Sequence, residues 1–255
     1  MGLSVRRPVL LQEKGANYEN HSDPHGTHNA QLTCYLQDPC TEMPALDRCP
    51  AILIFPGGAY AFCSDREADP VALAFLNAGY NAFVLRYSVS QNCPVEEVYT
   101  NAFAEAQEAM DYLHQNAGDL HIDPEQIAVV GFSAGGHLAA SVGTMGRVRP
   151  AAMLLGYAVF SVPGKALGME LPDLLQQVDD QTPPAFLFAT QGDHLVPATQ
   201  SLQFATLLAE RKIPYEMHIF AYGDHGFSTG SRHIANPQNR KTRNLQCGRA
   251  WHSAS

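Results

Sequence analysis

One serine of this chain stands in a sequence pattern that is suited to chemistry. Ser133 lies between two glycines in the pentapeptide GFSAG, residues 131–135, after the apolar run IAVV and before a stretch of small residues. If a strand precedes it and a helix follows, the glycines leave room for a tight turn in which a Cβ would clash. Such a turn exposes the hydroxyl at a helix N-terminus, where amide groups favour negative charge. The pattern predicts a nucleophile, and its plainer alternative is a glycine-rich turn with an incidental serine.

A serine hydroxyl is a weak nucleophile near neutral pH, so this chemistry requires a base and an acid that orients the base. In a sheet of this kind both partners follow later strands, with the acid before the histidine. Asp193 lies just beyond the apolar run 185–190, and His225 lies just beyond the run 215–220. Their order and placement predict a catalytic triad of Ser133, Asp193 and His225, which would transfer an acyl group through the serine.

Other histidines and aspartates suit the two roles less well. They adjoin the predicted residues, lie inside an expected strand or helix, or fall in an irregular segment: His194, Asp224, His218, His137, Asp179 and Asp180. A residue next to its partner cannot easily turn its side chain back to it, and His137 is expected to pack in the helix after the serine. The alternative that Asp193 and His225 are ordinary surface residues without a catalytic role stays open.

Acyl transfer also needs N–H groups that bind the negatively charged oxygen of the tetrahedral intermediate. One donor is expected to be the amide of Ala134, which follows the nucleophile. The segment FPGGAY, residues 55–60, follows an expected strand, and Gly57 and Gly58 let backbone N–H groups turn inward there. A PGG sequence alone is an ordinary turn, but beside the serine pattern it indicates an oxyanion loop.

These residues require a scaffold, and apolar runs alternate with helical patterns along most of the chain. The expected strands and helices are 30–36, 50–55, 67–77 (helix), 81–87, 95–116 (helix), 127–130, the helix from 135, 151–160, 185–190, 197–212 (helix) and 215–220, with a turn at 123–126. This alternation predicts an α/β fold with a mostly parallel central sheet and helices on both faces. Residues 161–184 interrupt it and would form an excursion where a substrate cap would lie. No element is predicted after Gly226.

Length and charge narrow the function further. With 255 residues the chain is expected to form a single domain, 1–255, with its core at about 30–228 and an uncertain tail at 229–255. It carries 16 Lys and Arg against 25 Asp and Glu, a formal charge of −9, and its one short basic segment is 240–243. This charge argues against nucleic acid and against a membrane surface as the main partner. No apolar run approaches the roughly 18 residues of a membrane span.

The chain's cysteines and histidines give weaker signals. Six cysteines are scattered without a CxxC pair, which favours reduced thiols over a disulfide framework: Cys34, Cys40, Cys49, Cys63, Cys93 and Cys247. The N-terminal residues do not read as a secretory signal, so a cytoplasmic location is expected. His21, His25 and His28 lie close together, but the proline and glycine between them favour a polar loop over a metal site. We expect neither a metal nor a cofactor.

Five segments of the chain, taken together, carry a resemblance: PGGAY, SDREADPVALAFLNAGYNAFVLRYSV, GFSAGGHLAAS, TPPAFLFATQGDHLVP and HIFAYGDHGF. They resemble the α/β-hydrolase superfamily, and more closely the compact esterases that include bifunctional acetyl xylan and feruloyl esterases. The resemblance implies that Ser133, Asp193 and His225 form the triad, with oxyanion amides at Gly58, Ala59 and Ala134.

The chain also departs from related enzymes. The hormone-sensitive-lipase branch carries HGGG where this chain has Pro56-Gly57-Gly58-Ala59, so the turn of this loop stays open. The resemblance further implies a C-terminal helix with a tryptophan, here Trp251, although the residues before it match such a helix poorly.

The function expected from these features is hydrolysis of a carboxylic ester through an acyl-serine. The resemblance implies a small acyl group, acetyl above all, on a carbohydrate or a similar alcohol, so the expected partner is a small-molecule or oligosaccharide ester. Two rivals stay open on the same fold: an aryl formamidase or a short-peptide hydrolase, which would share the triad, and a non-catalytic binding protein, which would normally lack it.

Overall fold

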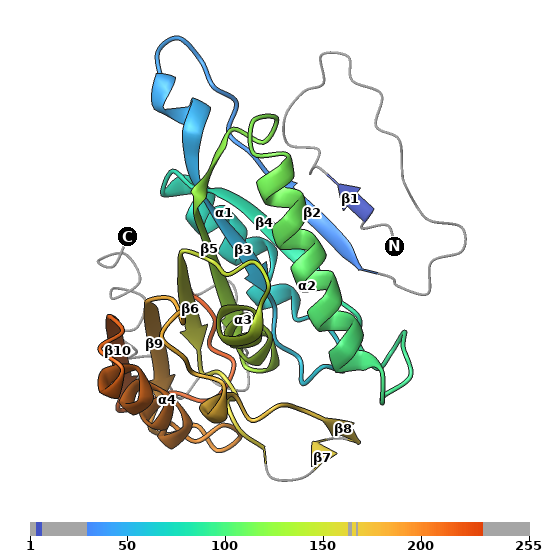
Figure 1. Ribbon diagram of the computed structural model, residues 1–255, viewed down its shortest axis with the longest axis vertical. Coiled ribbons are helices and arrows are strands. Elements are labelled where there is room, and N and C mark those ends of the chain that lie inside the picture. The colour runs from blue at the N-terminus through green and yellow to red at the C-terminus, as the bar shows by residue number, and fades with distance from the viewer. Residues whose placement is uncertain (1–3, 7–29, 163–164, 167, 232–255) are drawn as a thin grey trace.

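The structure, a computed structural model, describes residues 4–6, 30–162, 165–166 and 168–231. The described residues form a central eight-stranded sheet in the order β1-β2-β4-β3-β5-β6-β9-β10 (Figure 1). Neighbouring strands are parallel except β2 and β4, which are antiparallel. The strands are β1 (Ser4–Arg6), β2 (Gln31–Tyr35), β3 (Cys49–Phe55), β4 (Asn81–Arg86), β5 (Ile122–Phe132), β6 (Ala152–Gly156), β9 (Ala185–Thr190) and β10 (Tyr215–Phe220). The predicted fold class is confirmed.

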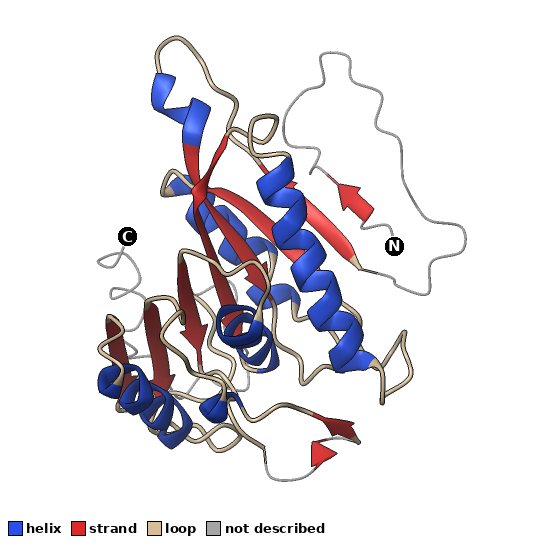
Figure 2. Ribbon diagram, viewed as in Figure 1, coloured by secondary structure: helices blue, strands red, loops and turns tan. Residues whose placement is uncertain are grey.

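The helices cover both faces of this sheet (Figure 2). They are α1 (Asp69–Asn77), α2 (Val98–Gln115), α3 (Ala134–Met145) and α4 (Thr199–Glu210). Helices α2, α3 and α4 share a buried cluster with Leu53 and Phe55 of β3, whereas α1 packs in a second cluster with Ile52 and Ile54. Successive side chains of a strand point to opposite faces, so α1 lies on the face opposite the other three helices. Strand β3 is continuously apolar because both of its faces are buried.

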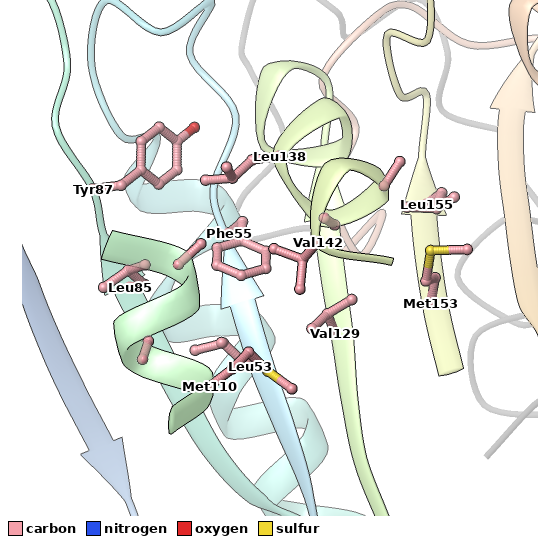
Figure 3. Packing of buried hydrophobic residues seen from close by; sticks show 14 of the residues in the cluster. Leu53, Phe55, Leu85, Tyr87, Met110, Val129, Leu138, Val142, Met153 and Leu155 are labelled. Atoms are coloured by element: carbon pink, nitrogen blue, oxygen red, sulfur yellow. The ribbon is translucent and has the colours of Figure 1, made fainter. Parts of the chain in front are cut away.

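The larger cluster fixes the centre of the sheet against α2 and α3. Figure 3 shows Leu53 and Phe55 of β3 facing Met110 of α2 and Val142 of α3. These side chains are fully buried, as is Val129 of β5. Burying one side chain of this size is worth roughly 1.5–3 kcal/mol relative to exposure. Together such contacts hold β3, β5 and α3, the three elements around Ser133, in one rigid arrangement.

The turn predicted at residues 123–126 is wrong, because these residues belong to β5. Cys49 pairs with Ile122 and Ala51 already pairs with Ile127, so the residues between bulge out of the ladder without ending the strand. Asp123 makes this bulge stable. Its carboxylate accepts hydrogen bonds from the amide of Glu125 at 3.1 Å, from Gln126 at 2.9 Å and from Arg48 at 2.9 Å.

Two other predicted boundaries are also wrong. The strand expected at 151–160 ends at Gly156, because Tyr157 has a φ of 34° and turns the chain out of the sheet. The helix expected at 67–77 begins only at Asp69; residues Asp65–Glu67 form a separate 3₁₀ turn, and Ala68 between them has non-helical dihedral angles. The sequence analysis predicts neither β1 (Ser4–Arg6) nor the 3₁₀ turn at Pro44–Arg48. The other strands of the central sheet and the other helices lie where the sequence predicts them, with ends that shift by a few residues.

The excursion expected at residues 161–184 contains a small antiparallel pair, β7 (Lys165–Ala166) with β8 (Met169–Glu170), and a 3₁₀ turn at Leu174–Gln176. Figure 1 shows β7 and β8 at the end of the molecule to which the arrowhead of β6 points. The carboxyl ends of parallel strands are where α/β sheets place their ligands. The excursion therefore lies where a wall of a binding site is expected.

Several sequence-based expectations concern residues outside the described part of the chain: His21, His25, His28, Cys247 and Trp251. No disulfide joins any two of the five cysteines within the described part. Among the described residues, no three histidine, cysteine or acidic side chains come together as a metal site would require. None of the described helices has the length and the apolar character needed to cross a membrane.

The turn from β5 to α3 brings two backbones into direct contact. A Cβ on Gly135 would lie 2.1 Å from the carbonyl oxygen of Phe55 and 2.4 Å from that of Pro56, on the neighbouring strand β3 and the loop after it. On the other side, a Cβ on Gly131 would lie 2.1 Å from the oxygen of Gly135. Backbone atoms cannot give way as a flexible side chain can, so both positions require glycine.

We expect Gly135→Ala to lower the free energy of unfolding by about 3 kcal/mol, because the new methyl group forces β3 and α3 apart. Gly118→Ala is the matched control, since nothing lies within 4 Å of a Cβ at that position. Urea denaturation of both variants and of the wild type measures the difference. Equal stability of the two variants would contradict the close approach at residue 135.

Candidate active site

Ser133 occupies the strained turn between β5 and α3. Its φ of 54° and ψ of −119° are unfavourable for any residue with a Cβ, at a cost of roughly 1–3 kcal/mol. Three backbone hydrogen bonds hold it there. Its amide donates to the oxygen of Gly156 at 2.9 Å, and its oxygen accepts from the amides of His137 at 3.0 Å and Val159 at 3.3 Å. At about 0.5–1.5 kcal/mol each, these bonds offset the strain.

The structure brings the three predicted side chains into one hydrogen-bonded chain. His225 Nε2 lies 2.8 Å from Ser133 Oγ, and His225 Nδ1 lies 2.6 Å from Asp193 Oδ2. A carboxylate can only accept, so Nδ1 carries the proton and Nε2 is free to accept the serine proton. This is the tautomer that a general base requires.

Asp193 is held by its own loop as well as by the histidine. Its Oδ1 accepts hydrogen bonds from the amides of Leu195 and Val196, each at 2.9 Å, and its side chain is 1% exposed. Burial would raise the pKa of Asp193, but the hydrogen bonds from His225 and from these two amides outweigh it, and the pKa lies below its ordinary value. The carboxylate therefore stays charged beside His225.

None of the alternative residues takes part in this hydrogen-bonded chain. Three of them are exposed: His194, His218 and Asp224. Asp179 forms an ion pair with Arg149 at 2.5 Å, and Asp180 forms one with Arg211 at 3.4 Å. Both aspartates of the excursion are therefore paired with arginines and not with the histidine that the catalytic acid has to orient.

The loop after β3 has the geometry of a backbone cradle. Gly58, Ala59 and Tyr60 have φ values of 132°, 57° and 56°, so three successive residues adopt left-handed conformations. A Cβ on Gly58 would lie 2.0 Å from the oxygen of Phe62, which explains the glycine. Two successive non-glycine residues in this region indicate a backbone held in place for a purpose.

The residues whose amides are expected to bind an oxyanion lie around the same cavity as the serine. Gly58, Ala59 and Ala134 line the same cavity as Ser133. Within the part of the chain that the structure describes, none of their amides donates a hydrogen bond to another residue. The amide of Gly57, which sequence reasoning also pointed inward, instead donates to Glu67 Oε2 at 2.8 Å.

His137 ties the cradle to the excursion. Its Nε2 lies 3.2 Å from the carbonyl oxygen of Pro172, so this nitrogen carries the proton, and its Nδ1 accepts a hydrogen bond from the Tyr60 hydroxyl at 2.9 Å. The ring is fully buried, and burial lowers the pKa of His137 from 6.5 to about 4. One neutral imidazole thus joins Tyr60, helix α3 and Pro172.

Sequence reasoning missed two residues of the site, Glu67 and Tyr157. The Tyr157 ring lies edge-on to the His225 ring with centroids 4.9 Å apart, and its hydroxyl donates to Glu67 Oε1 at 2.5 Å. Tyr157 directly follows β6, at the same sheet edge as Ser133 and Asp193, which was a usable signal. The strand predicted to run through 151–160 concealed it. Nothing in the sequence distinguishes Glu67 from an ordinary acidic residue of a helix start.

The cavity over Ser133 has a volume of about 570 Å³. Aliphatic and aromatic side chains form much of its wall: Phe62, Val159, Val162, Met169, Leu171, Leu195 and Val196. Three of these come from the excursion, which therefore contributes to the binding site. Arg66 lies at the cavity and donates to the oxygen of Gly226 at 3.0 Å. The size suits a small ligand, with an apolar wall and few polar groups near the serine.

Comparison with known proteins places this geometry among hydrolases. A model of the BD-FAE family matches residues 41–153, and a model of the prolyl oligopeptidase family matches residues 166–243. The chain is 28% identical to an acetylxylan esterase of Xylanibacter ruminicola over 79% of its own length and 44% of that protein. It spans less than half of the length of the first curated relatives it matches, 33% of one and 44% of the other.

Two crystal structures match the chain over nearly its whole length. An α/β hydrolase enzyme from a Medee basin deep-sea metagenome library is 43% identical, with 89% of each chain covered and a TM-score of 0.77. An acetyl ester-xyloside bifunctional hydrolase from Caldicellulosiruptor lactoaceticus is 30% identical, with 93% of this chain and 94% of that chain covered and a TM-score of 0.72.

The buried state of His137 predicts a pH dependence of stability. In the unfolded chain this histidine titrates at its ordinary pKa of 6.5, whereas the folded pKa is about 4, so between these values the unfolded state binds more protons. We expect the free energy of unfolding to fall by about 2–3 kcal/mol through this residue between pH 7.5 and pH 4.5. Urea denaturation at both pH values measures it.

Carboxylates also titrate in this range, so the comparison is between variants. In His137→Gln the difference between the two pH values should shrink by that amount, while His218→Gln, which changes an exposed histidine, should keep the wild-type difference. An unchanged difference in His137→Gln would show that the buried imidazole does not carry it.

Proposed function

The chain belongs to the α/β-hydrolase family, and from this premise we propose that it is a serine carboxylic-ester hydrolase that acts through an acyl-serine. The observation that carries the proposal is the hydrogen-bonded chain from Ser133 through His225 to Asp193 beside the cavity. Esterases among the relatives support the same class of reaction.

In the proposed first half-reaction, Ser133 Oγ attacks the ester carbonyl while His225 Nε2 takes the serine proton. The new C–O bond gives a tetrahedral oxyanion, which then collapses and breaks the bond to the alcohol. His225 returns its proton to that leaving alcohol. A water molecule repeats the sequence on the acyl-serine, releases the acid and restores the serine.

The remaining groups stabilise charge in this scheme. Asp193 fixes the His225 tautomer and supports the imidazolium, which its charged state and its 2.6 Å hydrogen bond favour. The amides of Gly58, Ala59 and Ala134 would donate to the oxyanion. Their backbone is held in a fixed conformation before substrate arrives, and such preorganised donors cost no reorganisation during the reaction.

For the substrate, we propose an acetyl or other small acyl ester of a carbohydrate. Two relatives support this choice: the acetylxylan esterase of Xylanibacter ruminicola and the acetyl ester-xyloside bifunctional hydrolase of Caldicellulosiruptor lactoaceticus. A cavity of about 570 Å³ suits an acyl group together with part of a sugar. No cofactor and no metal takes part in the proposed reaction.

A second candidate is hydrolysis of short peptides. The prolyl oligopeptidase model covers residues 166–243, which include Asp193 and His225 as well as part of the excursion. A peptidase would use the same three side chains, and the leaving group would be an amine. Because the catalytic groups are shared, only the substrate separates the two candidates.

We expect wild-type protein to hydrolyse p-nitrophenyl acetate and to release acetate from acetylated xylo-oligosaccharides. Ser133→Ala should lower kcat on both substrates by at least about a thousandfold, because it removes the nucleophile. An aminoacyl p-nitroanilide, measured on the same samples, tests the peptidase candidate. Circular dichroism and urea denaturation serve as the control for folding.

Three outcomes would change the proposal. Full activity in Ser133→Ala would overturn the assignment of the nucleophile. Release from the model ester without release from the acetylated sugar would overturn the carbohydrate substrate and keep the serine hydrolase. Preferential cleavage of the anilide would favour the peptidase.

The assignment of the acid has its own test. Asp193→Asn should lower kcat by about a thousandfold or more, because the amide no longer fixes Nδ1–H and the imidazolium loses its charged partner. Asp224→Asn should stay within about twofold of wild type, since this neighbouring carboxylate is exposed and lies outside the hydrogen-bonded chain. The reverse order of the two effects, measured on p-nitrophenyl acetate, would assign the acid to residue 224.

A further inference from the structure

A second buried carboxylate lies next to the site and takes no part in the mechanism described above. Glu67 is 3% exposed, and each of its oxygens accepts one hydrogen bond. Oε2 accepts from the amide of Gly57 at 2.8 Å, and Oε1 accepts from the Tyr157 hydroxyl at 2.5 Å. The amide of Ser228 donates in turn to the Tyr157 oxygen at 3.0 Å. One side chain therefore joins the loop after β3, the residue after β6 and the loop that follows His225.

The donors fix which form of Glu67 fits. A backbone amide can only donate, and the Tyr157 oxygen already accepts from Ser228, so its hydroxyl proton points to Glu67. Both carboxylate oxygens must accept, as an ionised carboxylate does. A glutamine of the same shape would set its NH₂ group against one of these donors and leave a buried polar group without a partner.

The residue before Glu67 holds the same histidine loop. The Arg66 guanidinium donates to the oxygen of Gly226 at 3.0 Å, and the Ser228 hydroxyl donates to the backbone oxygen of Arg66 at 2.7 Å. Arg66 thus contacts the chain on both sides of residue 227. The loop that carries His225 is attached to the segment that follows the oxyanion loop, although the two lie far apart in sequence.

We propose that Glu67 is a positioning residue for catalysis, which holds the oxyanion loop through Gly57 and presses Tyr157 against His225. Through Gly57 it sets the backbone immediately before Gly58 and Ala59. Through Tyr157 it supports the edge of the His225 ring, with centroids 4.9 Å apart, so that Nε2 stays aimed at the serine. The inference rests on the proposed function, because it assigns Glu67 a part in that same reaction.

Burial raises the pKa of Glu67 above its ordinary value, and the hydrogen bonds from Tyr157 and Gly57 and the charges of Arg66 and His225 offset only part of this effect. The two donors, and not the buried surroundings, therefore favour the ionised carboxylate. Tyr157 contacts Glu67 through its hydroxyl and the His225 ring through its own ring. An imidazolium that forms during the reaction would meet a second negative charge beyond the Tyr157 ring.

The chain offers a matched control in Glu105, another buried carboxylate. Glu105 is 2% exposed and accepts hydrogen bonds from the Ser88 amide at 2.6 Å and the Ser88 hydroxyl at 2.5 Å. It lies on α2 and does not line the cavity. Glu105→Gln makes the same chemical change in a similarly buried place, so it reports what a disturbed buried carboxylate does to folding alone.

The experiment compares kcat and KM for p-nitrophenyl acetate in four proteins: wild type, Glu67→Gln, Tyr157→Phe and Glu105→Gln. We expect Glu67→Gln to lower kcat by about 10- to 100-fold with KM within about twofold, because the loops that act in the transition state lose their support. Tyr157→Phe keeps the ring and removes the hydroxyl, and should lower kcat by about 3- to 10-fold. Glu105→Gln should keep kcat within about twofold.

A double variant sharpens the test. In Glu67→Gln the new side-chain NH₂ group faces a donor, either the Tyr157 hydroxyl or the Gly57 amide. Adding Tyr157→Phe removes the first of these donors and with it part of the clash. The double variant should therefore lose less kcat than the product of the two single losses. Independent multiplication of the losses, or kcat within twofold of wild type in Glu67→Gln, would overturn the proposal. If Glu67→Gln does not fold, Tyr157→Phe decides, and an unchanged kcat in that variant would overturn it as well.

Failure of this inference is distinct from failure of the proposed function. If the wild type hydrolyses the ester, Ser133→Ala does not, and Glu67→Gln matches the wild type, then the esterase stands and the role of Glu67 falls. If the wild type does not hydrolyse the ester at all, the proposed function falls first, and the assignment of Glu67 falls with it.

Discussion

The carbonyl oxygen of Phe55 lies where a side chain on residue 135 would have to begin, and the rest of the site depends on this close approach. It brings the first turn of α3 against the end of β3, so that the turn at Ser133 and the loop at 56–60 are set by a single backbone contact. The nucleophile and the backbone that would face its substrate therefore cannot move independently. Their relative position is a property of the core, where Phe55 packs against α3, and not of the surface loops.

Around this contact, buried polar groups are matched donor to acceptor. Asp193 accepts hydrogen bonds from a histidine nitrogen and two backbone amides, and Glu67 accepts them from a backbone amide and a tyrosine hydroxyl. His137 donates one hydrogen bond and accepts another. A buried polar group without a partner costs about 1–3 kcal/mol, so each of these sets favours one arrangement of loops over its neighbours. The same partners fix the protonation states of two side chains near the serine: His137 is neutral and Asp193 is ionised.

Much of this was predictable because strand order constrains where chemistry can lie. Apolar runs marked the strands, and Asp193 and His225 stood out because each follows such a run at the end where α/β sheets gather their functional residues. The same argument missed Tyr157, because an apolar sequence run does not reveal that one of its residues has a left-handed backbone conformation and ends the strand. It missed the bulge at 123–126 because turn-forming residues can also be accommodated within a ladder, here by the carboxylate of Asp123. The role of Glu67 could not be predicted from the sequence, because it depends on hydrogen-bond partners 10 and 90 residues away.

The link between His137 and the excursion is a main-chain carbonyl, that of Pro172, and every kind of residue can supply a carbonyl. The attachment of this wall to the reaction centre is therefore independent of which side chains the wall displays. Val162, Met169 and Leu171 can be exchanged for larger, smaller or more polar residues without touching that hydrogen bond. Substrate preference then depends on the side chains of the excursion, whereas its attachment to the reaction centre depends on a backbone atom. New specificities can therefore evolve in the excursion at little cost to the catalytic residues.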